Sequence, residues 1–189
     1  MRPGPPMFWK MPEIWTVGYG GLGKDLFLAS LRRAGIEAVA DVRSAPFSRA
    51  FPWVCKEQLK QLLKDSGIAY VWLPELGGKV EVSSYEEVWE SEAFLKGIGR
   101  LEAGAGKMRV AMLCAEMDPM ECHRGLMVGE FLFRRGWRVV HLWPEREEEH
   151  GQACLRLANR LGMKDSLFWS GEDLRREAVR EMGKRVLGR

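Results

Sequence analysis

The stretch Met108–Arg124, with the sequence MRVAMLCAEMDPMECHR, decides the fold. Residues Arg109 to Leu113 are an almost continuous apolar run, which is typical of a strand buried on both faces. Asp118-Pro119-Met120-Glu121 has the residues of a helix start, with Asp as N-cap, Pro at the first helical position and Glu three residues after the cap. We therefore expect a buried strand, a turn, and a helix that runs to about Arg135.

The turn in this stretch carries many reactive side chains. Two thiols, an imidazole, a guanidinium and several carboxylates lie within it, at Cys114, Glu116, Asp118, Glu121, Cys122, His123 and Arg124. Strand-to-helix turns often carry binding and catalysis in open α/β sheets, because the unpaired N–H groups of the helix start favour anions. The sequence predicts a functional site at this turn.

The alternation of strand and helix continues on both sides of the turn. Strands are expected near residues 14–17, 37–42, 68–73, 109–113 and 137–142, and further helices near 24–34, 55–65, 85–102, 145–161 and 172–186, the last one basic and exposed. This spacing predicts a single three-layer α/β domain over residues 13–189, with a mostly parallel, Rossmann-like sheet of about five strands and helices on both faces. Residues 14–143 would form its core and 145–187 its C-terminal helices. Residues 1–12, rich in Pro and Gly, are expected to form a flexible tail.

The composition is typical of a globular protein, with 46% hydrophobic and 29% charged residues among 189. The net charge of +3 is too small to indicate a nucleic-acid-binding protein by itself. No signal peptide is recognised, and no apolar run approaches the roughly 20 residues of a membrane span. We expect a cytoplasmic protein with no membrane partner, whose four cysteines are free thiols.

Polar residues follow the ends of the predicted strands. Because the carboxyl ends of parallel strands meet at one edge of a sheet, we expect these residues to share one rim, where ligands bind in such folds. The residues expected at this rim are Tyr19, Gly20, Asp41, Arg43, Glu75, Cys114 and Glu116.

Four ordered segments resemble a known family. They are TVGYGG from Thr16, DVRSAPFSR from Asp41, GIAYVWLPELGG from Gly67, and CAEMDPMECHR from Cys114, and they resemble the "domain of unknown function 488" family from about residue 14 to 143. The family pattern often has His-Ser where this chain has Tyr-Gly, at positions 19 and 20. The resemblance implies a compact α/β domain of bacterial or archaeal type and brings no established reaction.

Cys114 has two interpretations. As a nucleophilic or redox thiolate, it would have its pKa lowered by the helix start and by Arg124 or His123. As a structural residue it would be a buried, inert thiol, and the neighbouring carboxylates would oppose a thiolate. The spacing to Arg124 does not match the Cys-x5-Arg loop of cysteine phosphatases, which excludes that mechanism. If Cys114 is structural, any catalysis would rest on Asp41, Glu116 and His123.

Two arginines favour an anion site. Asp41 and Arg43 lie on one face of their strand, either as a structural ion pair or as one arm of an anion site. In the second case Arg43 and Arg124 would bind a phosphate or carboxylate from two sides, and Ser44 and Ser48 could donate to the same anion.

The carboxylates of Glu75 and Glu116 end separate strands. They could form a general acid–base pair, or they could pair with arginines. Zinc is a further possibility, with Cys114, Cys122 and His123 as ligands and Glu116 as a fourth group. If Cys122 and His123 both lie in the helix, however, their side chains diverge by roughly 100°, so no metal is predicted.

Three functions are consistent with these patterns. The first is an anion-binding cleft at the carboxyl edge of the sheet, which would serve an enzyme acting on a phosphate-bearing small molecule or nucleic acid. The second is a nucleic-acid-binding module without catalysis, in which the basic helix near 172–186 could contact phosphates. The third is a zinc-binding protein. No organic cofactor is predicted.

Overall fold

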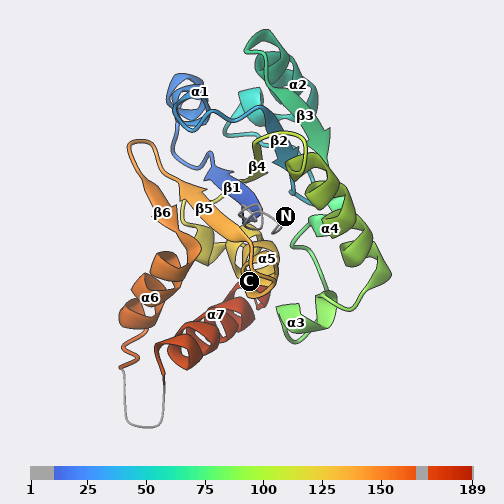
Figure 1. Cartoon of the computed structure of the whole chain (residues 1–189). Helices are drawn as coiled ribbons and strands as arrows, with labels where there is room; N and C mark the ends of the chain where they lie inside the picture. The colour runs from blue at the N-terminus through green and yellow to red at the C-terminus, as the bar shows by residue number, and fades with distance from the viewer. Residues whose placement is uncertain (1–10, 165–169, 189) are drawn as a thin grey trace, which may run out of the picture.

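One six-stranded sheet organises the protein in a computed structural model that describes residues 11–164 and 170–188. The spatial order of the strands is β3-β2-β4-β1-β5-β6 (Figure 1). Their bounds are β1 Glu13–Gly18, β2 Ala38–Asp41, β3 Ala69–Trp72, β4 Val110–Cys114, β5 Arg138–Leu142 and β6 Glu147–Glu149. The first five strands are parallel, and β6 pairs antiparallel with β5. This confirms the predicted single α/β domain, with one strand more than expected. The tail expected over residues 1–12 falls, apart from residues 11 and 12, outside the described residues.

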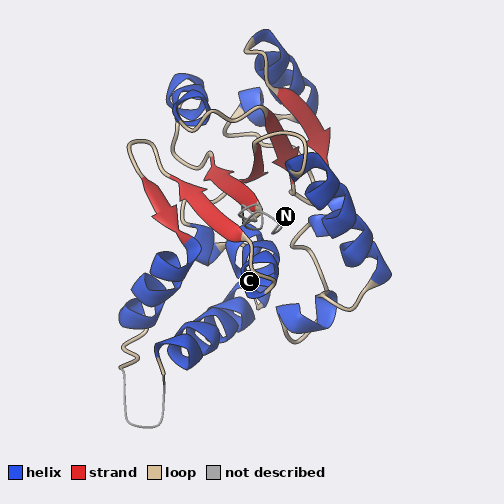
Figure 2. Ribbon diagram, viewed as in Figure 1, coloured by secondary structure: helices blue, strands red, loops and turns tan. Residues whose placement is uncertain are grey.

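Helices cover both faces of the sheet (Figure 2). Helices α1 and α2 lie on one face, and α4 to α7 lie on the other. The helices are α1 Lys24–Arg33, α2 Lys56–Asp65, α3 Tyr85–Val88, α4 Glu92–Ala105, α5 Glu130–Arg134, α6 His150–Arg160 and α7 Gly171–Leu187. Three short 3₁₀ turns, η1 Pro52–Val54, η2 Pro74–Leu76 and η3 Pro119–Glu121, and a π-helical segment, η4 Arg124–Gly129, complete the order.

Strand β4 explains why both layers form. All five of its residues are buried. Successive side chains of a strand point to opposite faces. Val110 and Met112 join the apolar cluster under α4 to α7, whereas Ala111 and Leu113 join the cluster under α1 and α2. The uninterrupted apolar run is therefore required by a strand that is covered on both sides.

Two predicted helices differ from the helices of the structure. The helix expected over 85–102 is divided into α3 and α4, because the Ser91 hydroxyl caps a new helix by accepting the amide of Phe94 at 3.3 Å. Asp118 does act as a cap, accepting from the Met120 amide at 2.9 Å, but it caps only the short η3 turn. The chain is extended again at Cys122, and the long helical segment starts after it.

The helix expected over 145–161 starts only at His150, so this prediction is wrong for its first residues. Glu147–Glu149 is instead the edge strand β6, paired with β5. The alternation of a strand separates the three carboxylates: Glu148 binds Arg156 at 2.8 Å, and Glu149 binds Arg138 at 2.5 Å. Glu148 and Glu149 thus each bind an arginine, and Glu147 is exposed to solvent.

The last helix, α7, is correctly located but not merely exposed. Leu174, Ala178 and Met182 lie on one side at four-residue spacing and are buried. Ala178 and Met182 pack into the same apolar cluster as residues of β4 and β5, so the expectation of an exposed helix is wrong. Among the helices described, none is both long and apolar enough to cross a membrane.

Candidate functional site

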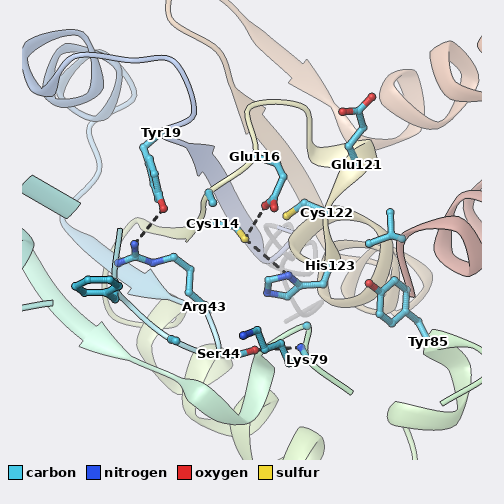
Figure 3. Close-up of a pocket in the computed structure, with 15 residues that line it drawn as sticks. Tyr19, Arg43, Ser44, Lys79, Tyr85, Cys114, Glu116, Glu121, Cys122 and His123 are labelled. Carbon is cyan, nitrogen blue, oxygen red and sulfur yellow. Dashed lines mark hydrogen bonds between the residues drawn. The ribbon is translucent and has the colours of Figure 1, made fainter. Parts of the chain in front are cut away.

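A cavity of about 480 Å³ opens where β1, β2 and β4 end (Figure 3). Strand pairing places Gly18 beside Cys114 and Asp41 beside Leu113, so the segments that follow these strands meet there. The cavity is lined by Tyr19, Arg43, Ser44, Ala45, Phe47, Gly78, Lys79, Tyr85, Cys114, Ala115, Glu116, Glu121, Cys122, His123 and Val186. The structure thus brings together most of the residues that the sequence placed at one rim.

The loops after β1 and β4 lie directly against each other. A Cβ atom at Gly18 would overlap the carbonyl oxygen of Glu116, so only glycine fits at the end of β1. The amide of Gly20 donates to the carbonyl of Ala115 at 2.7 Å. Gly20 is therefore a backbone contact between the loops, while the neighbouring Tyr19 side chain lines the cavity.

Cys114, Cys122 and His123 form a compact cluster at this cavity. Their two sulfur atoms and one imidazole nitrogen all lie within 4.8 Å of one another. Cys114 Sγ lies 3.7 Å from His123 Nδ1 and donates to Glu116 Oε2 at 3.1 Å. The expected divergence of Cys122 and His123 is wrong, because Cys122 has an extended backbone (φ −148°, ψ 151°) and is not part of the helix.

The surroundings of the His123 imidazole show which of its two nitrogens carries the hydrogen. The Nε2 atom lies 2.8 Å from the Val42 carbonyl oxygen. A carbonyl only accepts hydrogen bonds, so Nε2 carries a hydrogen and donates it. In the neutral imidazole the lone pair is therefore on Nδ1, the atom that faces the thiols. Burial disfavours the imidazolium, but the Cys122 sulfur and the Val42 carbonyl raise the pKa of His123 above its ordinary value.

The two thiols have opposite acidities. The neighbouring Cys122 sulfur, together with burial and the charge of Glu116, raises the pKa of Cys114 well above its ordinary value. Burial also disfavours a thiolate at Cys122, but the Cys114 thiol and the charge of Arg124 lower the pKa of Cys122 well below its ordinary value. The lowered thiol pKa that one of the two interpretations expected at Cys114 is therefore found at Cys122.

Arg124 does not line the cavity. Its guanidinium is completely buried and donates to the carbonyls of Glu116 and Met117 and, at 3.2 Å, to the hydroxyl of Thr16. It also lies 3.5 Å from Cys122 Sγ. The predicted anion contact of Arg124 is wrong in this geometry, because its donors are used to hold the turn after β4 and to place positive charge beside Cys122.

Asp41 and Arg43 form a buried ion pair. The Arg43 guanidinium donates to both carboxylate oxygens of Asp41, at 2.8 and 2.6 Å, and to the carbonyl of Val54 at 2.8 Å. Tyr70 donates to the same carboxylate at 2.9 Å. Burial opposes a charged guanidinium, but Asp41 raises the pKa of Arg43 above its ordinary value. Asp41 and Arg43 thus form the structural ion pair that was one of the two expectations. Arg43 also lines the cavity, beside Tyr19.

Two predicted residues lie elsewhere. Ser48 accepts the amide of Phe51 at 3.1 Å and does not line the cavity. Glu75 lies in η2, which directs its carboxylate to Arg100 on α4 at 2.7 Å. The predicted acid–base pair of Glu75 and Glu116 is therefore wrong, since only Glu116 lines the cavity.

Lys79 is a lining residue that sequence reasoning missed. Its backbone amide donates to the Ser44 hydroxyl at 3.1 Å, which fixes the loop after η2 against the loop after β2. Lys79 and Ser44 lie across the cavity from Tyr19 and Glu116 (Figure 3). No ion pair holds the Lys79 ammonium in the described part of the chain. The Gly77-Gly78-Lys79 sequence after a strand end was the available signal.

Comparison with known proteins gives a family and no further relatives. No curated protein and no solved structure matches the chain. One family model matches residues 24–131, more than half of the chain, from the start of α1 through the thiol cluster to α5. The TVGYGG segment precedes the matched residues. The chain therefore belongs to the family described as Domain of unknown function DUF488.

Proposed function

We propose that this protein is an enzyme that acts on an anionic substrate, such as a phosphate-bearing small molecule, with Cys114, Cys122 and His123 as its reacting centre. The observation that carries the proposal is the orientation of His123, whose Nδ1 faces two thiols at a cavity of about 480 Å³. A cysteine that serves only as core packing needs neither an oriented imidazole nor access to a cavity. While no ion is bound there, the Nδ1 lone pair can accept a proton that a thiol or the substrate releases.

The charges around the cavity support an anionic ligand. Of its two carboxylates, Glu121 pairs with Arg160 at 2.9 Å and Glu116 accepts from the Cys114 thiol. Arg43 is neutralised by Asp41. The Lys79 ammonium is the lining cation that has no carboxylate partner among the described residues. An anion in the cavity would therefore meet the positive charge of Lys79, which lies across the cavity from the carboxylate of Glu116.

The first test is ligand-induced thermal stabilisation. We expect phosphate, sulfate or nucleotides to raise the melting temperature, since a ligand at about 100 times its Kd adds about 2.7 kcal/mol to the free energy of unfolding. Lys79→Gln should lose most of this shift, whereas Lys64→Gln, an exposed change on α2, should keep it. If no anion stabilises the protein, or if Lys79→Gln keeps the shift, the proposal is wrong.

Nucleic acid is the alternative ligand, and the same assay separates it. Three of the five cations in α7 pair with a carboxylate of the same helix: Arg176 with Glu172, Arg180 with Glu177 at 4.0 Å, and Lys184 with Glu181 at 2.8 Å. Because these carboxylates neutralise part of the positive charge of α7, the helix is less suited to binding nucleic-acid phosphates. Short oligonucleotides should therefore stabilise less than mononucleotides; a larger effect that falls steeply with salt would favour the nucleic-acid module instead. We place the protein in the cytoplasm, where a reducing environment keeps its cysteines free.

A further inference from the structure

We propose that Cys114 Sγ, Cys122 Sγ and His123 Nδ1 bind one zinc ion whose fourth position faces the cavity. This inference rests on the proposed function, because it names the cofactor of the same centre. Two thiolates and one imidazole are a ligand set that zinc accepts, and three protein ligands with an open fourth position are typical of catalytic zinc. A metal at this place would also explain why both thiols line the cavity.

The spacing of the ligand atoms fits a tetrahedral site. Zinc lies about 2.3 Å from sulfur and about 2.0–2.1 Å from nitrogen, so a sulfur and a nitrogen on one tetrahedral ion are separated by about 3.6 Å. Cys114 Sγ and His123 Nδ1 are 3.7 Å apart. All three atoms lie within 4.8 Å of one another, so Cys122 Sγ reaches the same point with a small adjustment.

The groups around the ligands hold them in the orientation that a metal needs. His123 donates its Nε2 hydrogen to the Val42 carbonyl at 2.8 Å, which leaves Nδ1 for the metal. A second hydrogen bond of this kind is usual for histidine ligands of zinc. Cys122 Sγ accepts from the backbone amide and the guanidinium of Arg124 at 3.3 and 3.5 Å, contacts that stabilise a thiolate.

Glu116 lies where it can act at the fourth position. Its Oε2 atom is 3.1 Å from Cys114 Sγ, and the residue lines the cavity. When Cys114 gives up its proton to bind zinc, this carboxylate is freed from the thiol. It can then accept a proton from a water molecule or a substrate group on the ion.

A second cluster of metal-binding side chains is less suitable. Glu130, His150 and Cys154 also have ligand atoms within 4.8 Å of one another. However, both imidazole nitrogens of His150 are already in hydrogen bonds at 3.0 Å, one with Glu130 and one with His141. The Glu130 carboxylate is also bound by Arg134 at 2.6 Å. No nitrogen lone pair is left for an ion there, so zinc should select the first cluster.

The experiment measures zinc in the full-length protein purified without chelator and then incubated with zinc. We expect about one zinc ion per chain, and cobalt in its place should give the intense charge-transfer absorption of thiolate ligands. Cys122→Ser should lower zinc affinity by at least about 100-fold, whereas Cys154→Ser should leave it unchanged. Alkylation of the folded wild-type protein provides a check that needs no variant: zinc should protect Cys114 and Cys122 but not Cys55.

Several results would overturn the zinc site. They are the absence of bound zinc after incubation, cobalt spectra without thiolate bands, equal loss of zinc in Cys154→Ser, or a Cys114–Cys122 disulfide in the protein as purified. The anion assay is run in parallel on protein treated with chelator. If anions still stabilise a protein that never binds zinc, the zinc inference alone fails. If zinc binds but no anion does, the anionic substrate alone fails.

Discussion

Gly78 lies against the imidazole of His123, and its missing side chain makes room for the orientation on which the site depends. A Cβ atom at position 78 would lie 2.5 Å from Nδ1. We expect Gly78→Ala to push the imidazole away and to lower the free energy of unfolding by about 1–3 kcal/mol, the usual cost of overpacking. Urea denaturation measures this change, and the anion-induced thermal shift should fall in the same variant.

The matched control for this change is Gly99→Ala. Gly99 lies within α4, and a Cβ atom there meets nothing within 4 Å. Alanine should therefore raise the free energy of unfolding by about 0.5–1 kcal/mol through its higher helix propensity. If Gly78→Ala behaves like Gly99→Ala, the imidazole of His123 is not held by this contact.

A buried chain of hydrogen-bonded side chains connects helices α5 and α6 with strands β5 and β1. Glu130 begins α5, His150 begins α6, and His141 lies in β5; all three side chains are buried. His141 Nδ1 lies 2.8 Å from the hydroxyl of Thr16, which also accepts from Arg124. The chain thus connects the packing of α5 and α6 with the arginine that supports the thiol cluster.

This chain predicts a pH dependence of stability. Burial disfavours the imidazolium of His150, but Cys154 and Glu130 raise the pKa of His150 to about 9, from an ordinary 6.5. A group whose pKa is higher in the folded protein than in the unfolded chain stabilises the folded state. This stabilisation is complete at pH values below the unfolded pKa and is lost as the pH rises through the folded pKa. We expect wild-type stability to fall between pH 6.5 and about 9, by on the order of 3 kcal/mol from this residue.

Urea unfolding at several pH values tests this dependence. The difference between wild type and His150→Gln should shrink as pH rises across the window from 6.5 to about 9. Titration of the unfolded chain's other groups affects both proteins equally, so the difference isolates His150. Parallel stability curves for the two proteins would contradict the assigned charge.

At the scale of the whole molecule, α7 is part of the single core. Its side chains Ala178, Val179 and Met182 belong to the same apolar cluster as residues of β4 and β5, and Val186 lines the cavity. Met182→Ala should therefore lower the free energy of unfolding by about 2–5 kcal/mol. Arg180→Ala, on the exposed face of the same helix, should change it by less than about 0.5 kcal/mol.

The same variants report on cooperativity. Tryptophan fluorescence and far-UV circular dichroism should give one coincident urea transition for wild type and for Met182→Ala, as in a single two-state domain. A separate early transition of helical signal, or a Met182→Ala change as small as that of Arg180→Ala, would mean that α7 is attached to the core only weakly.

Strand positions could be predicted because their signals are local. The apolar run of β4 and the short apolar segments before Gly18 and Asp41 identify strands regardless of their partners. Once the strands are parallel, the edge where they end follows, and Cys114, Glu116, His123, Arg43 and Tyr19 do line one cavity. The sequence did not predict strand β6, because its three glutamates form no apolar run. This edge strand is stabilised by its pairing with β5.

Side-chain roles were less predictable, since they depend on neighbours distant in sequence. Arg124 is turned inward by carbonyl groups after β4, and Glu75 is turned away by Arg100. Lys79 reaches the cavity because Ser44 holds its backbone. None of these partners is visible in a single segment of the chain.

By itself, the sequence determined the α/β architecture, the family and the turn at which reactive residues gather, because hydrophobic periodicity and capping residues act over a few neighbouring positions. Only the tertiary structure decided which thiol is acidic and which atoms share a point in space. Cys122 lies beside Arg124, Cys114 and His123 because its backbone is extended between two helical segments. Burial and charge act through space, so their effect on a pKa depends on distances that chain spacing does not specify.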